Sequence, residues 1–223
     1  MQSAASVIIT AKRKLNMLLA QSNQRAMYSW DAVSAVPLQR PGEISAAFAQ
    51  FGVDNYRAAA RYIAHLPYGR NRTVTDALIV LREGRGTCST KHALLRRLAA
   101  EQDLGVALIL GIYEMNARNT PGVEGVLRKY GLSTLPEAHC YLRIGSKRID
   151  LTRVGHEGQR LQPLRFLHEE EIDPEQIGSY KFDLHRRFLK HWMMETGADG
   201  GRSLQELWRI REECIVALSR KAQ

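Results

Sequence analysis

The sequence contains little of what defines several protein classes. It has three cysteines and seven prolines in 223 residues, and aromatic residues make up only 7% of the chain. Three cysteines are too few, and odd in number, for a disulfide framework, so a reducing compartment is expected. The low proline count argues against extensive disorder. The chain also lacks internal repeats and low-complexity tracts, which excludes fibrous and solenoid architectures.

Long apolar runs are missing as well. The longest run, VALILGIY at 106–113, covers eight residues, whereas a membrane-spanning helix needs about 20. The early positive charges Lys12, Arg13 and Lys14 follow a weak apolar segment instead of preceding it, which is the reverse of a secretory signal. We therefore expect a cytoplasmic protein without a membrane span.

What the sequence does contain is enough apolar material for one core, since 44% of the residues are hydrophobic. We expect a single domain over 1–223, of the α+β class. It should consist of a helical N-terminal part at 1–70, a core at 74–153 and a helical C-terminal extension at 160–223. Residues 115–137 between two core strands read as an irregular insertion with a short helical pattern.

The net charge of +9 lies entirely in the N-terminal half. Residues 1–100 hold 14 Lys and Arg against five Asp and Glu, and the rest of the chain is balanced. A basic face of this kind can attract an acidic partner. No aromatic interleaving or RNA-binding signature accompanies it, so nucleic acid is not expected as a partner. One alternative function is therefore a non-catalytic binding protein whose basic half holds an acidic partner.

Apolar periodicity and turn residues predict a definite order of elements. Helices are expected at 4–22, 44–66, 76–82, 87–102, 179–195 and 203–220. Strands are expected at 104–114, 138–144 and 147–153. The last helix opens with the capping box Ser203-x-x-Glu206, and the acidic segment 168–171 is predicted to be a solvated loop.

Cys88 lies at the start of the helix predicted over 87–102, within GRGTCSTKH. A thiol in the first helical turn is close to unpaired backbone N–H groups and to the positive end of the helix dipole, and both favour the thiolate. Gly84 and Gly86 allow the chain to turn sharply into the helix. The Cys88 amide is a candidate donor to an oxyanion. Lys91 should either add positive potential or point into water.

The dipeptide Gly145-Ser146 predicts a β-hairpin. Glycine at the first central position is typical of a two-residue type II′ turn, so Ile144 should face Lys147. This register fixes every other pair of the two strands, and the alternation of side chains divides them between two faces. The core face should carry Cys140, Leu142, Ile144, Ile149 and Leu151.

The opposite, polar face of the hairpin should carry His139, Tyr141, Asp150 and Thr152. His139 and Asp150 are diagonal neighbours there, with backbones about 7–8 Å apart. An imidazole and a carboxylate can close that gap with a hydrogen bond, which fixes the imidazole tautomer and stabilises the protonated ring. Cys88, His139 and Asp150 are therefore predicted to form a triad for acyl transfer by a thiol.

At these residues the sequence resembles the transglutaminase-like superfamily, a branch of the papain-like thiol enzymes. The resemblance covers about residues 74–153: a short helix, Gly-x-Gly-x-Cys88 opening a longer helix, an apolar strand, then His139 and Asp150 on successive strands. It implies a papain-like fold in which the helix that bears the nucleophile packs on a small antiparallel sheet, with additional helices at both ends. It also implies Cys88 as nucleophile, His139 as general base and acid, and Asp150 as orienting group.

The expected function is acyl transfer from an amide or related acyl donor through a Cys88 thioester, without a cofactor. The donor can belong to a protein, a peptide or another substrate. Water as the acceptor would make the protein an amidase, peptidase or deamidase, and an amine would make it an acyltransferase. The sequence leaves both open, because acceptor choice depends on pocket shape and water exclusion.

A metal site is the competing use of the same residues, built from Cys88, His92, His139 and Cys140. It is excluded because adjacent strand residues point to opposite faces and no CxxC pair is present. His92 is expected to face the core or to lie behind the site, and contact with the substrate is the remaining alternative. Cys140 and Cys214 are interpreted as structural.

Overall fold

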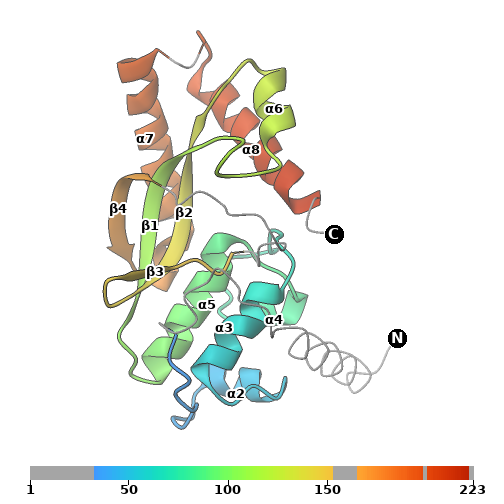
Figure 1. The fold of residues 1–223 in the computed structure, drawn as a ribbon, viewed down its shortest axis with the longest axis vertical. Helices are drawn as coiled ribbons and strands as arrows, with labels where there is room; N and C mark the ends of the chain where they lie inside the picture. Colours follow the sequence, from blue (N-terminus) through green and yellow to red (C-terminus); the bar gives the residue numbers. More distant parts are fainter. Residues whose placement is uncertain (1–32, 153–164, 198–199, 221–223) are drawn as a thin grey trace.

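The structure is a computed structural model, and it describes residues 33–152, 165–197 and 200–220 of the 223. The described residues combine seven α-helices with a four-stranded antiparallel sheet (Figure 1). The predicted α+β class is therefore confirmed. The basic helix predicted over 4–22 lies outside the described residues.

The sheet is built around two long antiparallel strands. β1 (Val106–Met115) and β2 (Leu135–Ile144) have ten residues each and pair over their whole length. β3 (Lys147–Ile149) pairs with the other edge of β2, and β4 (Phe166–Ile172) with the other edge of β1. The strand order is therefore β3-β2-β1-β4.

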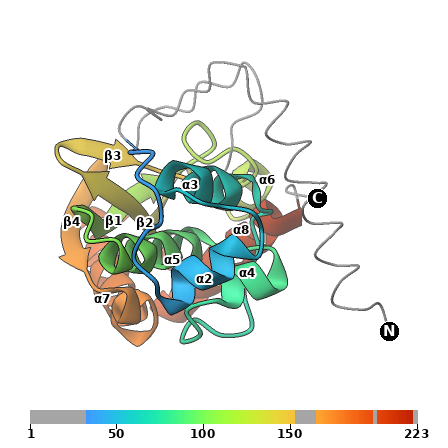
Figure 2. The ribbon, with the colours of Figure 1, turned by 90° about the horizontal axis from the view of Figure 1, so that it is seen from below.

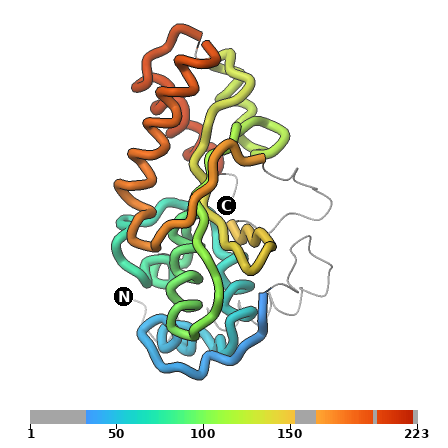
Figure 3. Tube along the Cα trace, turned by 90° about the vertical axis from the view of Figure 1, so that its left-hand side faces the viewer, coloured from blue at the N-terminus to red at the C-terminus, as the bar shows by residue number. Residues whose placement is uncertain are grey.

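The helices gather at the two ends of these long strands (Figures 1 and 3). One group consists of α2 (Glu43–Ala49), α3 (Tyr56–His65), α4 (Ile79–Glu83) and α5 (Cys88–Glu101). The other consists of α6 (Glu124–Lys129), α7 (Ser179–Thr196) and α8 (Leu204–Arg220), with the short 3-10 helix η2 (Pro174–Ile177) before α7. Within the described ranges, no helix has both the length and the apolar character that crossing a membrane requires.

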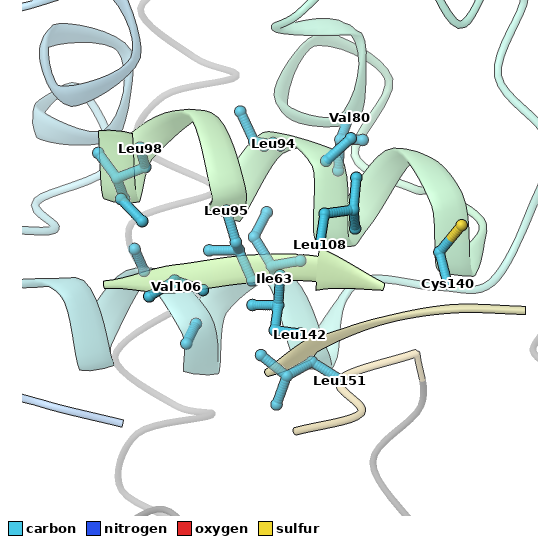
Figure 4. Packing of buried hydrophobic residues seen from close by; sticks show 14 of the residues in the cluster. Ile63, Val80, Leu94, Leu95, Leu98, Val106, Leu108, Cys140, Leu142 and Leu151 are labelled. Atoms are coloured by element: carbon cyan, nitrogen blue, oxygen red, sulfur yellow. The ribbon is translucent and has the colours of Figure 1, made fainter. Parts of the chain in front are cut away.

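The larger core lies between α5 and the sheet. Leu94, Leu95 and Leu98 of α5 are completely buried and lie over β1 (Figure 4). α5 also contacts α2 and α3 (Figure 2). Truncating one such leucine to alanine typically costs about 2–5 kcal/mol, so this packing holds α5 firmly. It places the start of the helix close to Cys140 of β2 (Figure 4).

β2 and β3 form the predicted hairpin. Ile144 pairs with Lys147 in the predicted register, and Gly145 has a φ of 57°, as its place in the turn requires. The second strand is shorter than predicted. It ends before Asp150, because the carboxylate of that residue accepts a hydrogen bond from the Thr152 amide at 3.0 Å and turns the chain away from the ladder.

The single helix predicted over 44–66 is wrong, because the structure has the two helices α2 and α3 there. The turn between them contains Gly52 with a φ of 72°. Asn55 then caps α3 by accepting a hydrogen bond from the Ala58 amide at 2.9 Å. A left-handed glycine and an asparagine cap end one helix and start the next. The other predicted helices within the described residues correspond to α4, α5, α7 and α8.

The acidic segment 168–171 is a strand, not the predicted solvated loop. It lies in β4 and pairs with β1. Its charges are matched across the sheet, since Glu171 accepts a hydrogen bond from Arg143 at 2.8 Å and Glu169 accepts one from Arg148 at 2.5 Å. Opposite charges on one face of a sheet stabilise the pairing, and a local run of like charges does not reveal those partners.

Candidate active site

Cys88 is the first residue of α5 and is 6% exposed. The side chain of Thr87 caps the helix by accepting a hydrogen bond from the Thr90 amide, and the Thr90 hydroxyl accepts one from the Thr87 amide at 3.0 Å. Within the described part of the chain, the Cys88 amide donates no hydrogen bond. The positive end of the helix and one free N–H group therefore lie at the thiol.

The structure contains the hydrogen bond that the hairpin register predicts. His139 Nε2 lies 2.7 Å from Asp150 Oδ2. Thr152 donates to the other carboxylate oxygen from its amide at 3.0 Å and from its hydroxyl at 2.6 Å. The carboxylate is thus held with one oxygen toward the imidazole. Because Nε2 is engaged, Nδ1 is the ring nitrogen that remains for the sulfur of Cys88.

The charges around Cys88 favour the thiolate. Burial alone would raise its pKa, but the positive charges of Lys181 and His139, with a hydrogen bond from His139, lower the pKa of Cys88 to about 6. Burial likewise opposes the charged form of His139, yet Asp150 and Cys88 raise the pKa of this ring well above its usual value. Burial would raise the pKa of Asp150 too, but attraction to His139 holds it well below its usual range. At neutral pH the three groups are a thiolate, an imidazolium and a carboxylate.

His92 lies one helical turn after Cys88 and connects α5 to the chain that follows β3. Its Nδ1 donates to the Cys88 carbonyl at 2.8 Å, and its Nε2 accepts from the Leu151 amide at 2.8 Å. These partners require the neutral ring with its proton on Nδ1, and burial, the main cause, lowers the pKa of His92 to about 4. The ring therefore ties the neighbour of Asp150 to the residue that carries the thiol.

Lys91 does not point into water. Its side chain is completely buried, and Nζ donates to the carbonyl oxygens of Leu66 at 2.6 Å and Thr152 at 2.9 Å. It connects the end of α3 to α5 and to the chain after β3. Lys91 therefore helps to hold Thr152, which in turn orients the Asp150 carboxylate.

Lys181 of α7 is not among the residues predicted from the sequence. Its Nζ donates to Ser89 Oγ at 2.7 Å and lies 3.9 Å from Cys88 Sγ. The sequence feature that could have indicated Lys181 is the pattern of α7, in which Lys181 and His185 occupy the same buried stripe as Leu189. Two polar residues on the buried face of an amphipathic helix indicate a specific partner in the interior.

A second ion pair lies on β2, two residues before His139. Arg211 of α8 donates to both carboxylate oxygens of Glu137, at 2.7 and 2.5 Å, and each side chain is 7% exposed. Burial would raise the pKa of Glu137, but Arg211 lowers it to about 2. His185 of α7 donates from Nε2 to the Pro136 carbonyl at 2.8 Å. Both C-terminal helices therefore contact β2 beside the site.

The remaining cysteines are buried free thiols. Burial, the main cause, raises the pKa of Cys140 and raises that of Cys214 to about 12. Among the residues that the structure describes, no group of three or more His, Cys, Asp or Glu side chains is arranged to hold a metal ion. A cavity of about 470 Å³ lies elsewhere, beside α2, where residues between Leu38 and Asp54 line it.

Many basic side chains of the N-terminal half already have acidic partners. Six arginines lie within 4.0 Å of a carboxylate: Arg40, Arg70, Arg72, Arg82, Arg85 and Arg97. These side chains do not form an unpartnered basic patch. The lysines and the arginine at 12–14 belong to the part of the chain outside the described ranges.

No protein-family model matches the chain, and it matches no curated protein and no solved structure. The resemblance to transglutaminase-like enzymes stays a prediction from the residues of 74–153.

Proposed function

We propose that the protein is a thiol-dependent acyl-transfer enzyme of papain-like, transglutaminase-like architecture, with Cys88 as nucleophile, His139 as general base and acid, and Asp150 as orienting group. One observation carries the proposal. A histidine held by a carboxylate at 2.7 Å lies beside a thiol whose pKa is lowered to about 6. Strongly shifted pKa values maintained by specific charge partners mark candidate functional sites, whereas a structural cysteine requires no such partners.

The first step forms a thioester. The Cys88 thiolate attacks the carbonyl carbon of the acyl donor, a carbon–sulfur bond forms, and the carbonyl oxygen takes the negative charge. The free Cys88 amide is a donor for that oxygen. The carbon–nitrogen bond then breaks, and the His139 imidazolium gives its proton to the leaving amine. The products of this step are a neutral imidazole and an acyl group on sulfur.

The second step releases the acyl group. Neutral His139 takes a proton from the attacking water or amine, whose oxygen or nitrogen bonds to the thioester carbon. The carbon–sulfur bond breaks, and the thiolate and imidazolium return. Asp150 stabilises the imidazolium at both ends of the cycle and keeps Nδ1 directed at the reacting atoms. Water as acceptor gives hydrolysis and an amine gives acyl transfer, and both remain compatible with the site.

The arrangement of the elements supports the papain-like part of the proposal. The helix that begins with Cys88 packs on the antiparallel sheet, and His139 and Asp150 come from a strand of that sheet and from the chain just after its neighbour. Each of the three side chains is thus carried by a different part of the fold: Cys88 by the start of α5, His139 by β2 and Asp150 by the chain just after β3. Each is fixed by packing or by backbone hydrogen bonds, which is what pre-organised catalysis requires.

The test uses a small activated acyl donor, p-nitrophenyl acetate, with the full chain. We expect a burst of nitrophenolate and a mass increase of one acetyl group on Cys88. Cys88→Ala should lose both while keeping its circular dichroism spectrum, and Cys214→Ala, which removes a buried thiol outside the site, should keep both. Full turnover by Cys88→Ala would reject the mechanism. Mass spectrometry of an acyl adduct trapped on Cys88 from cell extract would then identify the natural donor.

A further inference from the structure

The ammonium group of Lys181 is buried beside the thiol of Cys88. The side chain is 6% exposed, and Nζ donates to Ser89 Oγ at 2.7 Å and to Cys88 Sγ at 3.9 Å. No Asp or Glu forms an ion pair with Lys181 within the described residues. Burying an ammonium without a negative partner is costly. The site therefore needs a negative charge next to Nζ.

The nearby carboxylates are already used. His139 pairs with Asp150 at 2.7 Å, and Arg211 binds both oxygens of Glu137. Each of these pairs is neutral when its members are charged, so neither offsets the additional charge of Lys181.

The groups left to balance Lys181 are two thiols. Electrostatic attraction links Lys181 to Cys88, Cys140 and Glu137, and Arg211 already occupies both oxygens of Glu137. Burial, the main cause, raises the pKa of Cys140, which stays protonated at neutral pH. Cys88 is at the helix N-terminus, where the dipole also favours a negative charge. Cys88 is therefore the group that can supply the missing charge.

We propose that Lys181 is the counterion of the Cys88 thiolate, so that α7 of the C-terminal extension is part of the active site and not an appendage to it. This inference rests on the proposed function, since it assigns a partner to the thiolate used there. With Lys181 as counterion, ionisation of the sulfur before the reaction does not depend on the charge of His139 alone. The histidine is then free to serve the leaving group.

The arrangement also bears on the second half of the reaction. Thioester formation removes the negative charge from sulfur and leaves the buried ammonium of Lys181 without a counterion. Return of the thiolate restores that partner. Lys181 therefore favours breaking of the carbon–sulfur bond when water or an amine attacks.

Other titratable groups face this pair from several elements. They are Tyr113 on β1, Glu137, His139 and Cys140 on β2, His92 on α5, His185 on α7 and Arg211 on α8. Burial is the main reason that the pKa of Tyr113 is raised and that those of His92 and His185 are lowered, so these three carry no charge at neutral pH. The unbalanced positive charge at the thiol is that of Lys181.

The test follows ionisation of Cys88 against pH, by the ultraviolet absorbance of the thiolate in the full chain with Cys88→Ser as the reference. Site-resolved alkylation by iodoacetamide is the second readout. Lys181→Met should move the midpoint upward by about 1–3 pH units. Lys181→Arg should restore the midpoint of the natural protein. Lys190→Met removes an exposed lysine from the same helix and should change nothing.

The outcomes separate the two proposals. An unchanged midpoint in folded Lys181→Met would overturn the counterion role and leave acyl transfer by Cys88 standing. An ordinary thiol midpoint in the natural protein would instead contradict the proposed function. Lys181→Gln, which stays polar, replaces Lys181→Met if the latter does not fold, with the same upward shift expected. His139→Gln should keep a midpoint below that of an ordinary thiol, and a full return to the ordinary value would also overturn the counterion role.

Discussion

Two residues of β2 that are two positions apart, Glu137 and His139, each form an ion pair, and the two pairs differ in exposure and in chemistry. Glu137 and Arg211 share two hydrogen bonds, and each side chain is 7% exposed. His139 and Asp150 share one, and the Asp150 side chain is 42% exposed. Arginine keeps its proton at any physiological pH, so the first pair can only hold elements together. The second contains an imidazole beside a thiol, and its proton can move.

The largest effect is expected from the pair with the mobile proton. His139→Gln removes the group that we propose takes a proton from the water that attacks the thioester, so turnover should fall by about 10²–10⁴-fold. The measurement is steady-state release of nitrophenolate from p-nitrophenyl acetate. The unfolding midpoint in urea should change much less than in the Arg211 variant below. Equal losses of stability in both variants would contradict the view that only the Glu137–Arg211 pair serves mainly to hold elements together.

Arg211→Met should lower the free energy of unfolding by about 3–5 kcal/mol, because it leaves the Glu137 carboxylate buried without a partner. Urea unfolding at neutral pH measures this. The double variant Glu137→Leu/Arg211→Met removes both charges and should recover much of the loss. If Arg211→Met unfolds like the natural protein, the Glu137–Arg211 ion pair does not stabilise the fold.

The stability that the Glu137–Arg211 ion pair contributes depends on pH, and the direction of that dependence can be stated. Burial opposes ionisation of Glu137, but Arg211 lowers its pKa to about 2, against about 4.3 for a glutamate in an unfolded chain. Its contribution to stability is therefore complete above about pH 4.3 and is lost as the pH falls toward 2. Urea unfolding between those values should show a larger loss of stability in the natural protein than in the double variant, which keeps only the contribution of the other carboxylates.

Asp150→Asn should act on the pH profile more than on stability, since this side chain is partly exposed. Burial opposes the charge of His139 and Asp150 is the main reason that its pKa is raised, so removing the carboxylate lowers that pKa. The alkaline limb of the turnover profile should then move to lower pH by about 1–3 units. An unmoved alkaline limb would show that Asp150 does not hold the proton on His139.

The smallest effect is expected from the capping box of α8. Ser203 Oγ accepts a hydrogen bond from the Glu206 amide at 3.2 Å, and Ser203→Ala should cost about 1 kcal/mol. This change loosens the helix that carries Arg211 without touching either ion pair. Urea unfolding should detect it, while the ionisation of Cys88 stays the same. A shifted Cys88 midpoint would mean that α8 influences the thiol by a route other than the one we describe.

The sequence predicts the part of the candidate site whose geometry is set over short distances. A capped helix start places Cys88, and a two-residue turn places His139 relative to Asp150 by counting along two strands. Both depend on local signals, namely Thr87 before the helix and Gly145 in the turn. These rules predict the helix start and the hydrogen bond between His139 and Asp150. Cys88 approaches that pair through the packing of α5 on the sheet, which only the resemblance to a known family implied beforehand.

The features of the site that could not be predicted depend on how distant elements pack against one another. Lys181 lies 93 residues from Cys88 in the sequence, and its place follows from how α7 packs on β2. Arg211 reaches Glu137 only because α8 packs beside α7. The strand at 168–171 likewise depends on arginines of β2 and β3 across the sheet. Neither periodicity nor turn residues specify such partners.

The decisive measurement is the pH dependence of Cys88 alkylation by iodoacetamide, resolved by peptide mass spectrometry. We predict a midpoint near pH 6, with Cys140 and Cys214 unlabelled at that pH. A midpoint near 8.5, the value of an ordinary thiol, and no response to His139→Gln would contradict a thiolate built for acyl transfer.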